Sequence, residues 1–250
     1  MELALAAVVF APALALGSFL NVVVARLPEH RSLVRPRSAC PRCGHELAWW
    51  ENVPLVSYAA LRGRCQGCKA AISWRYPAVE LATAALVAAC FWHFGLTGDA
   101  LVAAYFCAVL VALSAIDVER RILPNAIVLP SFVLVLSAQL ALSPDQALEW
   151  VLGALGASLF LFAALLAYPK GMGMGDVKLA LLLGAMLGKL VGVGLMLGML
   201  AALGLSVVLF AQHGAAARKM AIPFGPFLAF GSIVALFWGQ EILDRYLSLF

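Results

Sequence analysis

The chain has 250 residues, of which 64% are hydrophobic and only 12% are charged, and its formal net charge is +4. Its mean hydropathy of +0.98 excludes an ordinary soluble globular domain, because about 25% of the residues in such domains are charged. The composition therefore predicts a membrane protein with several spanning helices. Nothing favours nucleic-acid binding, since the sequence has no run in which basic and aromatic residues alternate.

Apolar runs, taken in chain order, predict eight membrane-spanning helices, because a helix needs about 20 apolar residues to cross a bilayer. The first run lacks a basic start and a convincing cleavage site, which favours a retained helix over a signal peptide. The sixth run is short and rich in glycine, and it meets the seventh at Gly188 and Lys189. The predicted spans are 2–25, 78–96, 100–117, 124–142, 147–168, 177–188, 190–212 and 222–240.

The predicted fold class is an all-α polytopic membrane protein with three parts: helix 1 at 1–25, a polar loop domain at 26–77 and a seven-helix membrane domain at 78–250. Basic residues predict its orientation, because cytoplasmic loops are enriched in Lys and Arg. If the loop is cytoplasmic, both termini are periplasmic, and only Lys189 and Arg245 lie outside. The fifteen basic residues then inside are Arg26, Arg31, Arg35, Arg37, Arg42, Arg62, Arg64, Lys69, Arg75, Arg120, Arg121, Lys170, Lys178, Arg218 and Lys219.

The loop contains two C-x2-C pairs, Cys40 with Cys43 and Cys65 with Cys68. Each pair can chelate an ion through a tight turn, and two pairs complete a tetrahedral thiolate shell that favours zinc. A cytoplasmic loop is kept reduced, which argues against disulfides. Redox-active dithiols are the alternative. We favour structural zinc, because nothing else in the sequence resembles a redox fold and a loop of this size needs added stability.

Other residues of the loop have simpler interpretations. Gly44 and Gly67 stand beside the cysteines, where tight turns are wanted. His45 could replace a cysteine as a ligand, although four cysteines suffice. Outside the loop, Cys90 and Cys107 are expected to be small buried hydrophobic residues. Five aromatic residues of the loop are expected to serve as core or interfacial anchors, with a binding wall as the alternative: Trp49, Trp50, Tyr58, Trp74 and Tyr76.

Two aspartates stand where apolar runs reach the predicted cytoplasmic face. Asp117 ends the third run, and Asp176 opens the sixth behind the glycine-rich segment 171–175. Each has a simple explanation by itself, since Asp117 could pair with Arg120 or Arg121 and Asp176 could cap its helix. However, a carboxylate at a membrane boundary is costly unless it is paired, hydrated or functional. A plain cap also does not need three glycines.

Two neighbouring carboxylates can share one proton, so that one activates a water while the other polarises a carbonyl. We therefore predict that Asp117 and Asp176 are catalytic. Helix dipoles favour a charged Asp176 and a neutral Asp117, which makes Asp176 the base and Asp117 the acid of a coupled pair. The alternatives are a proton-coupled transporter and a zinc-stabilised scaffold without chemistry. A transporter predicts an inverted repeat, and we find none.

The ordered set of motifs resembles the type IV prepilin peptidases, the leader peptidase/N-methyltransferases of bacterial pilus and type II secretion systems. The G-x-G-D element alone is weak, because other intramembrane aspartyl proteases share it, but the set runs nearly from end to end. The motifs are GSFLNVV at 17–23, RLP at 26–28, the cysteine loop, ISWRYP at 72–77 with Glu80, Asp117 with ILPN at 122–125, GMGDVKL at 173–179 and IPFGPF at 222–227.

The resemblance implies an aspartyl endopeptidase of the bacterial inner membrane, with Asp117 and Asp176 as the catalytic pair. Its substrates would be prepilins and pseudopilins, cut after a glycine at the cytoplasmic face to remove a basic leader. The resemblance also implies methylation of the new N-terminal residue, usually phenylalanine, by S-adenosylmethionine, with Glu80 near the cofactor or the new N-terminus. The sequence has no glycine-rich cofactor fold of the soluble type, so a leader peptidase without methyltransferase activity is the alternative.

The substrate's hydrophobic helix is expected to lie in the lipid against the enzyme. Small residues on spans six and seven could receive this helix, although packing between the two spans is the commoner use of such residues. Glu46 and Glu51 could meet the basic leader, or they could be solvated charges of the loop. The small residues are Gly184, Gly188, Gly192, Gly194 and Gly198.

Overall fold

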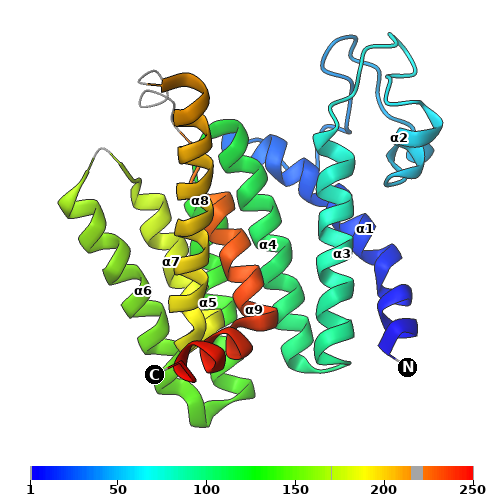
Figure 1. The fold of residues 1–250 in the computed structure, drawn as a ribbon. Helices are drawn as coiled ribbons and strands as arrows, with labels where there is room; N and C mark the ends of the chain where they lie inside the picture. Colours follow the sequence, from blue (N-terminus) through cyan, green and yellow to red (C-terminus); the bar gives the residue numbers. More distant parts are fainter. Residues whose placement is uncertain (1, 170, 215–221, 250) are drawn as a thin grey trace. The chain divides into compact units, whose positions relative to one another are not determined.

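The computed structural model describes residues 2–169, 171–214 and 222–249 (Figure 1). Within these residues the chain is helical, and its β structure is limited to two isolated bridges, Ala39 with Glu46 and Arg64 with Ala71. This confirms the predicted all-α fold class. The chain forms two compact units, unit 1 (Met1–Ala115) and unit 2 (Ile116–Phe250), and the boundary falls inside helix α4 (Gly98–Arg120).

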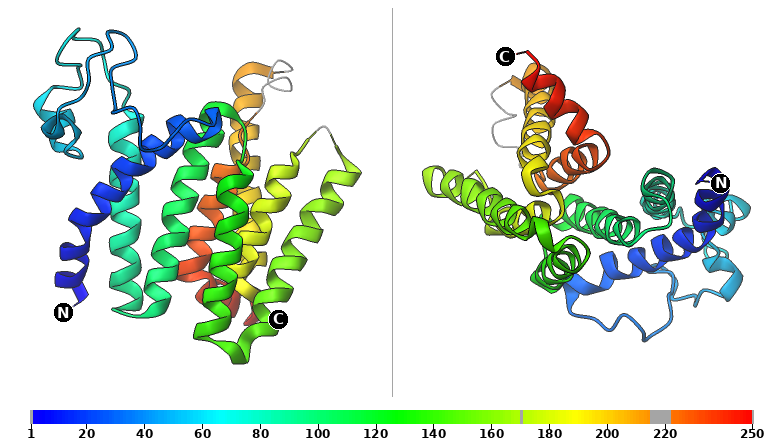
Figure 2. Two further views of the ribbon diagram at one scale, coloured as in Figure 1. Left: turned by 180° about the vertical axis from the view of Figure 1, so that it is seen from behind. Right: turned by 90° about the horizontal axis from the view of Figure 1, so that it is seen from below.

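Seven helical segments of the described residues are long and apolar enough to cross a membrane. One of them, Met174–His213, covers the sixth and seventh predicted spans together. A 3-10 turn, η4 (Gly188–Leu190), divides it into α7 (Met174–Leu187) and α8 (Val191–His213), which run in opposite directions (Figures 1 and 2). Gly188 has a φ of +53°, a conformation that glycine adopts without strain. The chain therefore reverses at the boundary that the sequence predicts.

Unit 1 is built on the packing of α1 (Glu2–Arg26) along α3 (Arg75–Phe94). Buried side chains of α3 recur every three or four residues, which is the pattern of a helix with one packed face. Gly17 allows the close approach, since a Cβ atom there would lie 2.7 Å from the Cα of Glu80. The buried residues of α3 are Val79, Glu80, Thr83, Ala84, Val87, Cys90 and Phe91.

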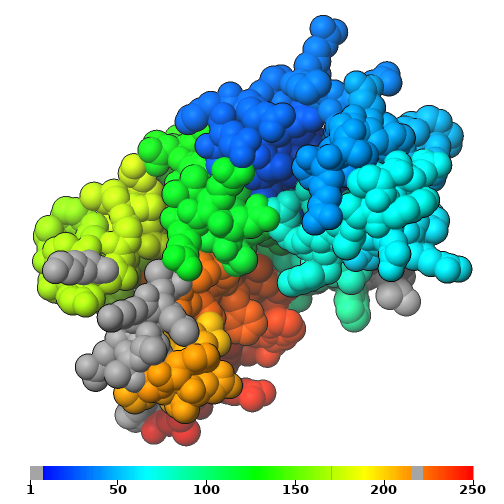
Figure 3. All heavy atoms as spheres, turned by 90° about the horizontal axis from the view of Figure 1, so that it is seen from above, coloured from blue at the N-terminus to red at the C-terminus, as the bar shows by residue number. Residues whose placement is uncertain are grey.

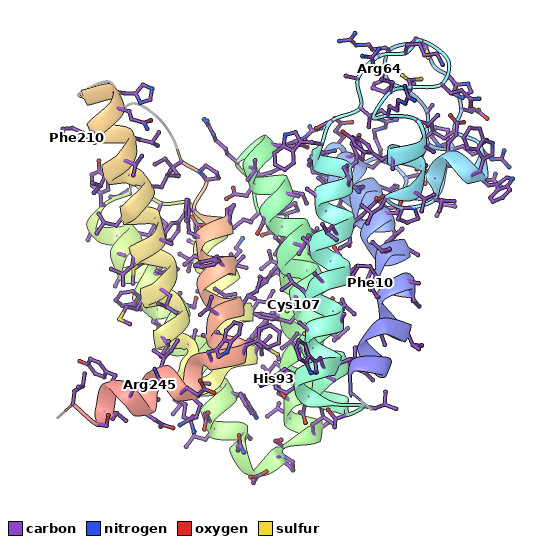
Figure 4. The ribbon with its side chains drawn as sticks, turned by 45° about the vertical axis from the view of Figure 1, so that its right-hand side comes forward. Phe10, Arg64, His93, Cys107, Phe210 and Arg245 are labelled. Carbon is purple, nitrogen blue, oxygen red and sulfur yellow. The ribbon has the colours of Figure 1, made fainter. Side chains whose placement is uncertain are left out.

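The segment between these two helices forms the cysteine loop, whose atoms lie at the surface of unit 1 (Figure 3, blue to cyan). It contains only short helices, and Arg64 marks its position in Figure 4. Arg26, at the end of α1, fixes the start of the loop by donating to the carbonyl oxygens of Ser32 at 3.0 Å and Pro36 at 2.8 Å. The short helices are η1 (Leu27–Glu29), η2 (Trp49–Asn52) and α2 (Val56–Ala60).

Helix α7 is the core of unit 2, where it packs mainly against three other helices. Nearly every side chain from Asp176 to Leu187 is buried, as expected for a helix that is apolar on all sides. Helix α8 packs mainly against α9. The partners of α7 are α5 (Asn125–Leu142), α6 (Ala147–Ala167) and α9 (Gly225–Leu247), and η3 (Pro144–Gln146) connects α5 to α6.

Several helices extend beyond the apolar runs that predict them. Helix α9 continues to Leu247, seven residues past the predicted end, and Gln240 donates to Asp244 at 2.7 Å in this extension. Such polar pairs one turn apart support a helix outside the membrane. Helix α7 begins at Met174, so Asp176 is its third residue. Hydropathy locates the apolar part of a helix, whereas local polar contacts decide where the helix ends.

Within unit 2, the helices alternate in direction as the eight-span prediction requires. Arg121 and Lys178 lie at the end where α5, α7 and α9 begin, whereas Lys189 lies at the opposite end. Figure 4 shows Phe210 and Arg245 at opposite ends of the unit. Three basic residues used for the predicted orientation, Lys170, Arg218 and Lys219, lie outside the described residues. The orientation in the membrane and the three-part domain division stay predictions.

Candidate active site and metal centre

Asp117 lies in the last turn of α4 and is 6% exposed. Its Oδ2 accepts a hydrogen bond of 2.9 Å from the backbone N–H of Gly225, the first residue of α9. A Cβ atom at position 225 would lie only 2.8 Å from this oxygen. The contact between these two helix ends therefore depends on glycine, a role that IPFGPF did not reveal in the sequence alone.

Asp176 is 9% exposed, and its Oδ2 accepts a hydrogen bond of 3.2 Å from the backbone N–H of Gly173. The carboxylate of Asp176 thus caps α7 from the third position of the helix. The simple explanation from the sequence had placed Asp176 at the N-cap itself. Lys178, two residues further on, donates to Asn125 at 3.0 Å and joins the starts of α7 and α5. These contacts fix the first turn of α7 and with it the direction of Asp176.

Leu123 connects the surroundings of the two aspartates. A Cβ atom at Gly175 would lie 3.1 Å from the Cβ of Leu123, and one at Gly225 would lie 3.4 Å from its Cδ2. The charges of Asp117 and Asp176 interact with each other. The structure therefore gathers both aspartates in one cluster of unit 2, and their catalytic roles stay a prediction.

Arg121 directly follows the end of α4 beside this cluster. It adopts a φ of +55°, and its backbone N–H donates to the carbonyl oxygen of Asp117 at 2.9 Å. Its side-chain charge also acts on the Asp117 carboxylate, but the ion pairs of the described residues do not include one between these two side chains. The reversed backbone at Arg121 directs the chain toward Leu123, which the sequence analysis named only as part of the ILPN motif.

The four loop cysteines form one cluster, in which all the sulfur atoms lie within 4.8 Å of one another. The Sγ of Cys40 is 3.9 Å from that of Cys68, and the Sγ of Cys43 is 3.9 Å from that of Cys65. A tetrahedral zinc site with Zn–S bonds of ~2.3 Å separates its sulfur atoms by ~3.8 Å. The cluster therefore fits a tetrahedral metal ion.

The two C-x2-C pairs have the same backbone geometry. The N–H of Cys40 donates to the carbonyl of His45 at 2.9 Å, and the N–H of Cys65 donates to that of Ala70 at 2.8 Å. In the return direction, Gly44 donates to Cys40 at 2.9 Å, and its counterpart Lys69 donates to Cys65 at 3.0 Å. Each pair thus closes a tight turn that presents two sulfur atoms on the same side.

Gly67 does not form the tight turn that was expected of it from the sequence. The residue with positive φ after each pair is Gly44 at +72° and Lys69 at +59°, so Gly67 does not supply the reversed backbone. Instead, a Cβ atom at Gly67 would lie 3.3 Å from the Cβ of His45 and 3.5 Å from the Sγ of Cys43. Gly67 allows the two turns to approach each other.

Thiol acidity within the cluster is uneven. The backbone N–H groups of Arg42 and Cys43 lower the pKa of Cys40 to about 6. The N–H of His45 also favours the Cys43 thiolate, but burial and the neighbouring thiols outweigh it and raise the pKa of Cys43 to about 11. Four thiolates so close together repel one another, so a bound cation is needed to hold all of them deprotonated.

Glu51 is neither a solvated loop charge nor accessible to a leader peptide, because it is only 6% exposed. It accepts the backbone N–H of Ala48 at 2.8 Å, and this hydrogen bond lowers the pKa of Glu51. Its other contact is with the Nε2 of His45 at 3.0 Å. His45 therefore supports η2 from beside the cluster, and among the residues that the structure describes the metal-ligand group consists of the four cysteines. Glu46 is exposed.

Glu80, expected near the cofactor or the new N-terminus, is 8% exposed in unit 1, and its Oε2 accepts the backbone N–H of Leu55 at 2.9 Å. The cysteines outside the loop, Cys90 and Cys107, are fully buried with their sulfur atoms 3.8 Å apart. This confirms the expectation that they are small buried residues.

Most glycines of spans six and seven pack inside unit 2, and one of them packs between those two spans. Gly184 lies against Gly153 of α6, and Gly188 lies against Glu149 and Trp150 of the same helix. On α8, Gly194 and Gly198 face Ser232, Phe227 and Leu228 of α9, while Gly192 has nothing within 4 Å. Packing between the two spans, the commoner use, is therefore found at one of these five glycines, since a Cβ at Gly194 would lie 3.2 Å from Leu187 of α7, while Gly184, Gly188 and Gly198 pack against α6 or α9.

Comparison with known proteins covers almost the whole chain. The model of the Type IV leader peptidase family matches residues 104–239, and that of the Bacterial Peptidase A24 N-terminal domain matches residues 12–94. No solved structure matches the chain.

Three relatives illustrate the similarity, and each is named prepilin leader peptidase/N-methyltransferase. The protein of Pseudomonas aeruginosa is 41% identical, over 94% of this chain and 91% of the relative. The protein of Burkholderia pseudomallei is 40% identical, over 96% of this chain and 86% of the relative. That of Aeromonas salmonicida is 38% identical, over 96% of this chain and 93% of the relative.

Proposed function

We propose that this chain, which belongs to the type IV leader peptidase family, is a bifunctional prepilin peptidase. It cleaves the basic leader of prepilins or pseudopilins and then methylates the new N-terminal residue. The observation that carries this proposal is the buried cluster in unit 2, in which Asp117 and Asp176 interact and each accepts a backbone N–H. Because its relatives align with nearly the whole chain, both activities in their name apply to this protein.

Peptide cleavage by two aspartates needs no covalent intermediate. One carboxylate removes a proton from water as the water oxygen bonds to the scissile carbonyl carbon, and the protonated partner donates its proton to the carbonyl oxygen. The C–N bond then breaks, the leaving nitrogen takes up the proton held by the base, and the proton on the former carbonyl oxygen returns to the acid. By the helix-dipole argument Asp176 acts as the base and Asp117 as the acid. The N–H groups of Gly173 and Gly225 hold the two carboxylates in place.

The cysteine cluster holds a structural zinc ion in this proposal. Its sulfur spacing supports a tetrahedral thiolate site, and zinc is the usual ion of four-cysteine sites. S-adenosylmethionine supplies the methyl group to the second activity when it is bound. The buried acid Glu80 suits a cationic ligand, and both the methyl donor and the new amino terminus are cationic.

In this proposal the protein lies in the bacterial inner membrane, with both termini periplasmic and the aspartates facing the cytoplasm. The distribution of basic residues supports this orientation, and in unit 2 Arg121 and Lys178 lie at the same end as both aspartates. We assign helix 1–25 and the loop 26–77 to anchoring and metal binding, and the seven-helix domain 78–250 to the peptidase. The partners are the hydrophobic helix of the substrate and membrane lipid.

Asparagine substitution tests the aspartates without changing the size of the side chain. Purified Asp117→Asn and Asp176→Asn should cleave a prepilin about 10²- to 10⁴-fold more slowly than wild type, the usual contribution of a general acid or base. Asp145→Asn, at an exposed aspartate of unit 2, is the matched control and should cleave normally. Unimpaired cleavage by either active-site variant would refute the proposed mechanism.

Mass spectrometry of the product made by the wild-type protein distinguishes the bifunctional enzyme from a leader peptidase alone. With S-adenosylmethionine present, the mature protein should gain the mass of one methyl group at its amino terminus. Normal cleavage without this gain would leave the leader peptidase without methyltransferase activity as the correct function.

A further inference from the structure

Unit 1 contains a buried carboxylate without a balancing cation. Glu80 is 8% exposed in α3, accepts the backbone N–H of Leu55 at 2.9 Å and also interacts with the side chain of Ser18. Among the described residues, no Lys, Arg or His side chain forms an ion pair with Glu80. Since burying an unpaired carboxylate is costly, this position is suited to a positively charged ligand.

Asn21 provides an independent sign of a ligand in the same place. It is 4% exposed, and its Nδ2 donates to the carbonyl oxygen of Tyr76 at 3.0 Å, while its Oδ1 is buried and has no hydrogen-bond partner among the described residues. Tyr76 lies one helical turn before Glu80 on α3, and Asn21 lies about one turn after Ser18 on α1. Asn21 and Glu80 therefore lie about one helical turn apart along the contact between α1 and α3, and each offers a hydrogen-bond acceptor.

The backbone over Glu80 is strained. Leu55 has a φ of +58° and a ψ of −44°, and the N–H of Val56 donates to the carbonyl of Pro54 at 2.6 Å. These features define a γ-turn of the rare type with positive φ, which is costly for a residue with a branched side chain. The N–H that this turn presents is the one bound to Glu80. Strained backbone of this kind is typical of ligand clamps.

We propose that Glu80 and Asn21 bind the amino terminus that leader cleavage creates, and that the γ-turn at Pro54–Val56 covers it. The inference rests on the proposed function, since it assigns a place to the group that becomes methylated. A primary ammonium offers three N–H donors, which match the carboxylate of Glu80 and the free Oδ1 of Asn21. The sulfonium centre of the methyl donor has charge but no N–H and cannot satisfy Asn21, and the peptide's ammonium is distinguished from the donor's own amino group by the test below. Glu80 and Asn21 hold the nitrogen in position, and no proton transfer is assigned to them.

The test compares two synthetic peptides that begin with phenylalanine and continue with apolar residues, one with a free amino terminus and one acetylated. Their affinities for the purified full-length protein in detergent are measured without the methyl donor. Wild type should bind the free amine about 10- to 100-fold more tightly, the range expected for hydrogen bonds to a charged group. Glu80→Gln should bring this ratio close to one, because glutamine can still accept the N–H of Leu55 but carries no charge.

Controls separate a binding role from a structural one. Thr83→Val changes a buried residue of α3 whose hydroxyl bonds only to Val79 of its own helix, and the ratio should stay at the wild-type value. Glu80→Asp should recover part of the preference. If Glu80→Gln fails to accumulate, Asn21→Val provides the same comparison and should also lower the ratio. In the folded variants Glu80→Gln and Asn21→Val, methylation of the product should be lost.

An unchanged ratio in Glu80→Gln would overturn the inference, as would a wild type that does not distinguish the two peptides. Weaker binding of S-adenosylmethionine with an unchanged peptide ratio would also overturn it, and would assign Glu80 to the methyl donor. Failure of the proposed function looks different: the wild-type protein would then neither cleave a prepilin nor methylate the product.

Discussion

At the scale of single residues, Gly225 sets how closely the start of α9 approaches Asp117. In Gly225→Ala the added Cβ would lie 2.8 Å from Oδ2 of Asp117, so the carboxylate must turn or α9 must shift. Either change disturbs the hydrogen bond of 2.9 Å that orients the carboxylate. A misplacement of about 1 Å can cost 10²-fold in rate, so initial rates of prepilin cleavage should fall about 10- to 100-fold.

Gly156→Ala is the matched control for this substitution, because no other atom lies within 4 Å of a Cβ at that position of α6. Its cleavage rate should equal that of wild type. If Gly225→Ala cleaves as fast as Gly156→Ala, the contact between Gly225 and Asp117 does not position the carboxylate.

Residues whose roles are local could be predicted from the sequence, and residues whose roles depend on folding could not. The spacing of the four cysteines defines a ligand set because each pair closes its own turn. Glu51 looks like any loop acid until the fold buries it beside His45. Lys69 gives no sign of its reversed backbone, since glycine is the residue expected at a φ of +59°.

At the scale of helices, glycines decide which pairs come into close contact. A Cβ at Gly184 of α7 would clash with the backbone of Gly153 and Ala154 in α6. Gly184→Ala should therefore push α6 away from α7 and destabilise the protein by about 1–3 kcal/mol, the usual cost of overpacking. Thermal unfolding in detergent should show a lower Tm.

Gly204→Ala, in the exposed middle of α8 with nothing within 4 Å, is the control and should not lower the Tm. Equal melting temperatures for the two variants would show that α6 and α7 are not held together at Gly184.

Apolar runs are enough to count the spans, because each must cross the same thickness of lipid. They cannot identify the partners of α7, since lipid and protein both accept apolar side chains.

At the scale of the whole molecule, the two proposed activities depend on different units. The cysteine cluster, Glu80 and the γ-turn at Leu55 belong to unit 1, whereas Asp117, Asp176 and Gly225 belong to unit 2. The proposed zinc site lies in the same loop as Leu55, and the N–H of Leu55 bonds to Glu80. Disturbing the loop should therefore reach the methylation site through this contact while leaving the contacts of the aspartates intact.

Removal of the metal tests this division. Treatment with a strong chelator, or Cys43→Ser together with Cys68→Ser, should release zinc, lower the Tm and reduce methylation far more than leader cleavage. The reason is that a loop with little core of its own depends on the metal for its structure. Metal content, Tm, cleavage rate and methyl incorporation are measured on the same preparation. Cys90→Ala, outside the cluster, should keep its zinc, and full methylation by metal-free protein would contradict the link between the loop and Glu80.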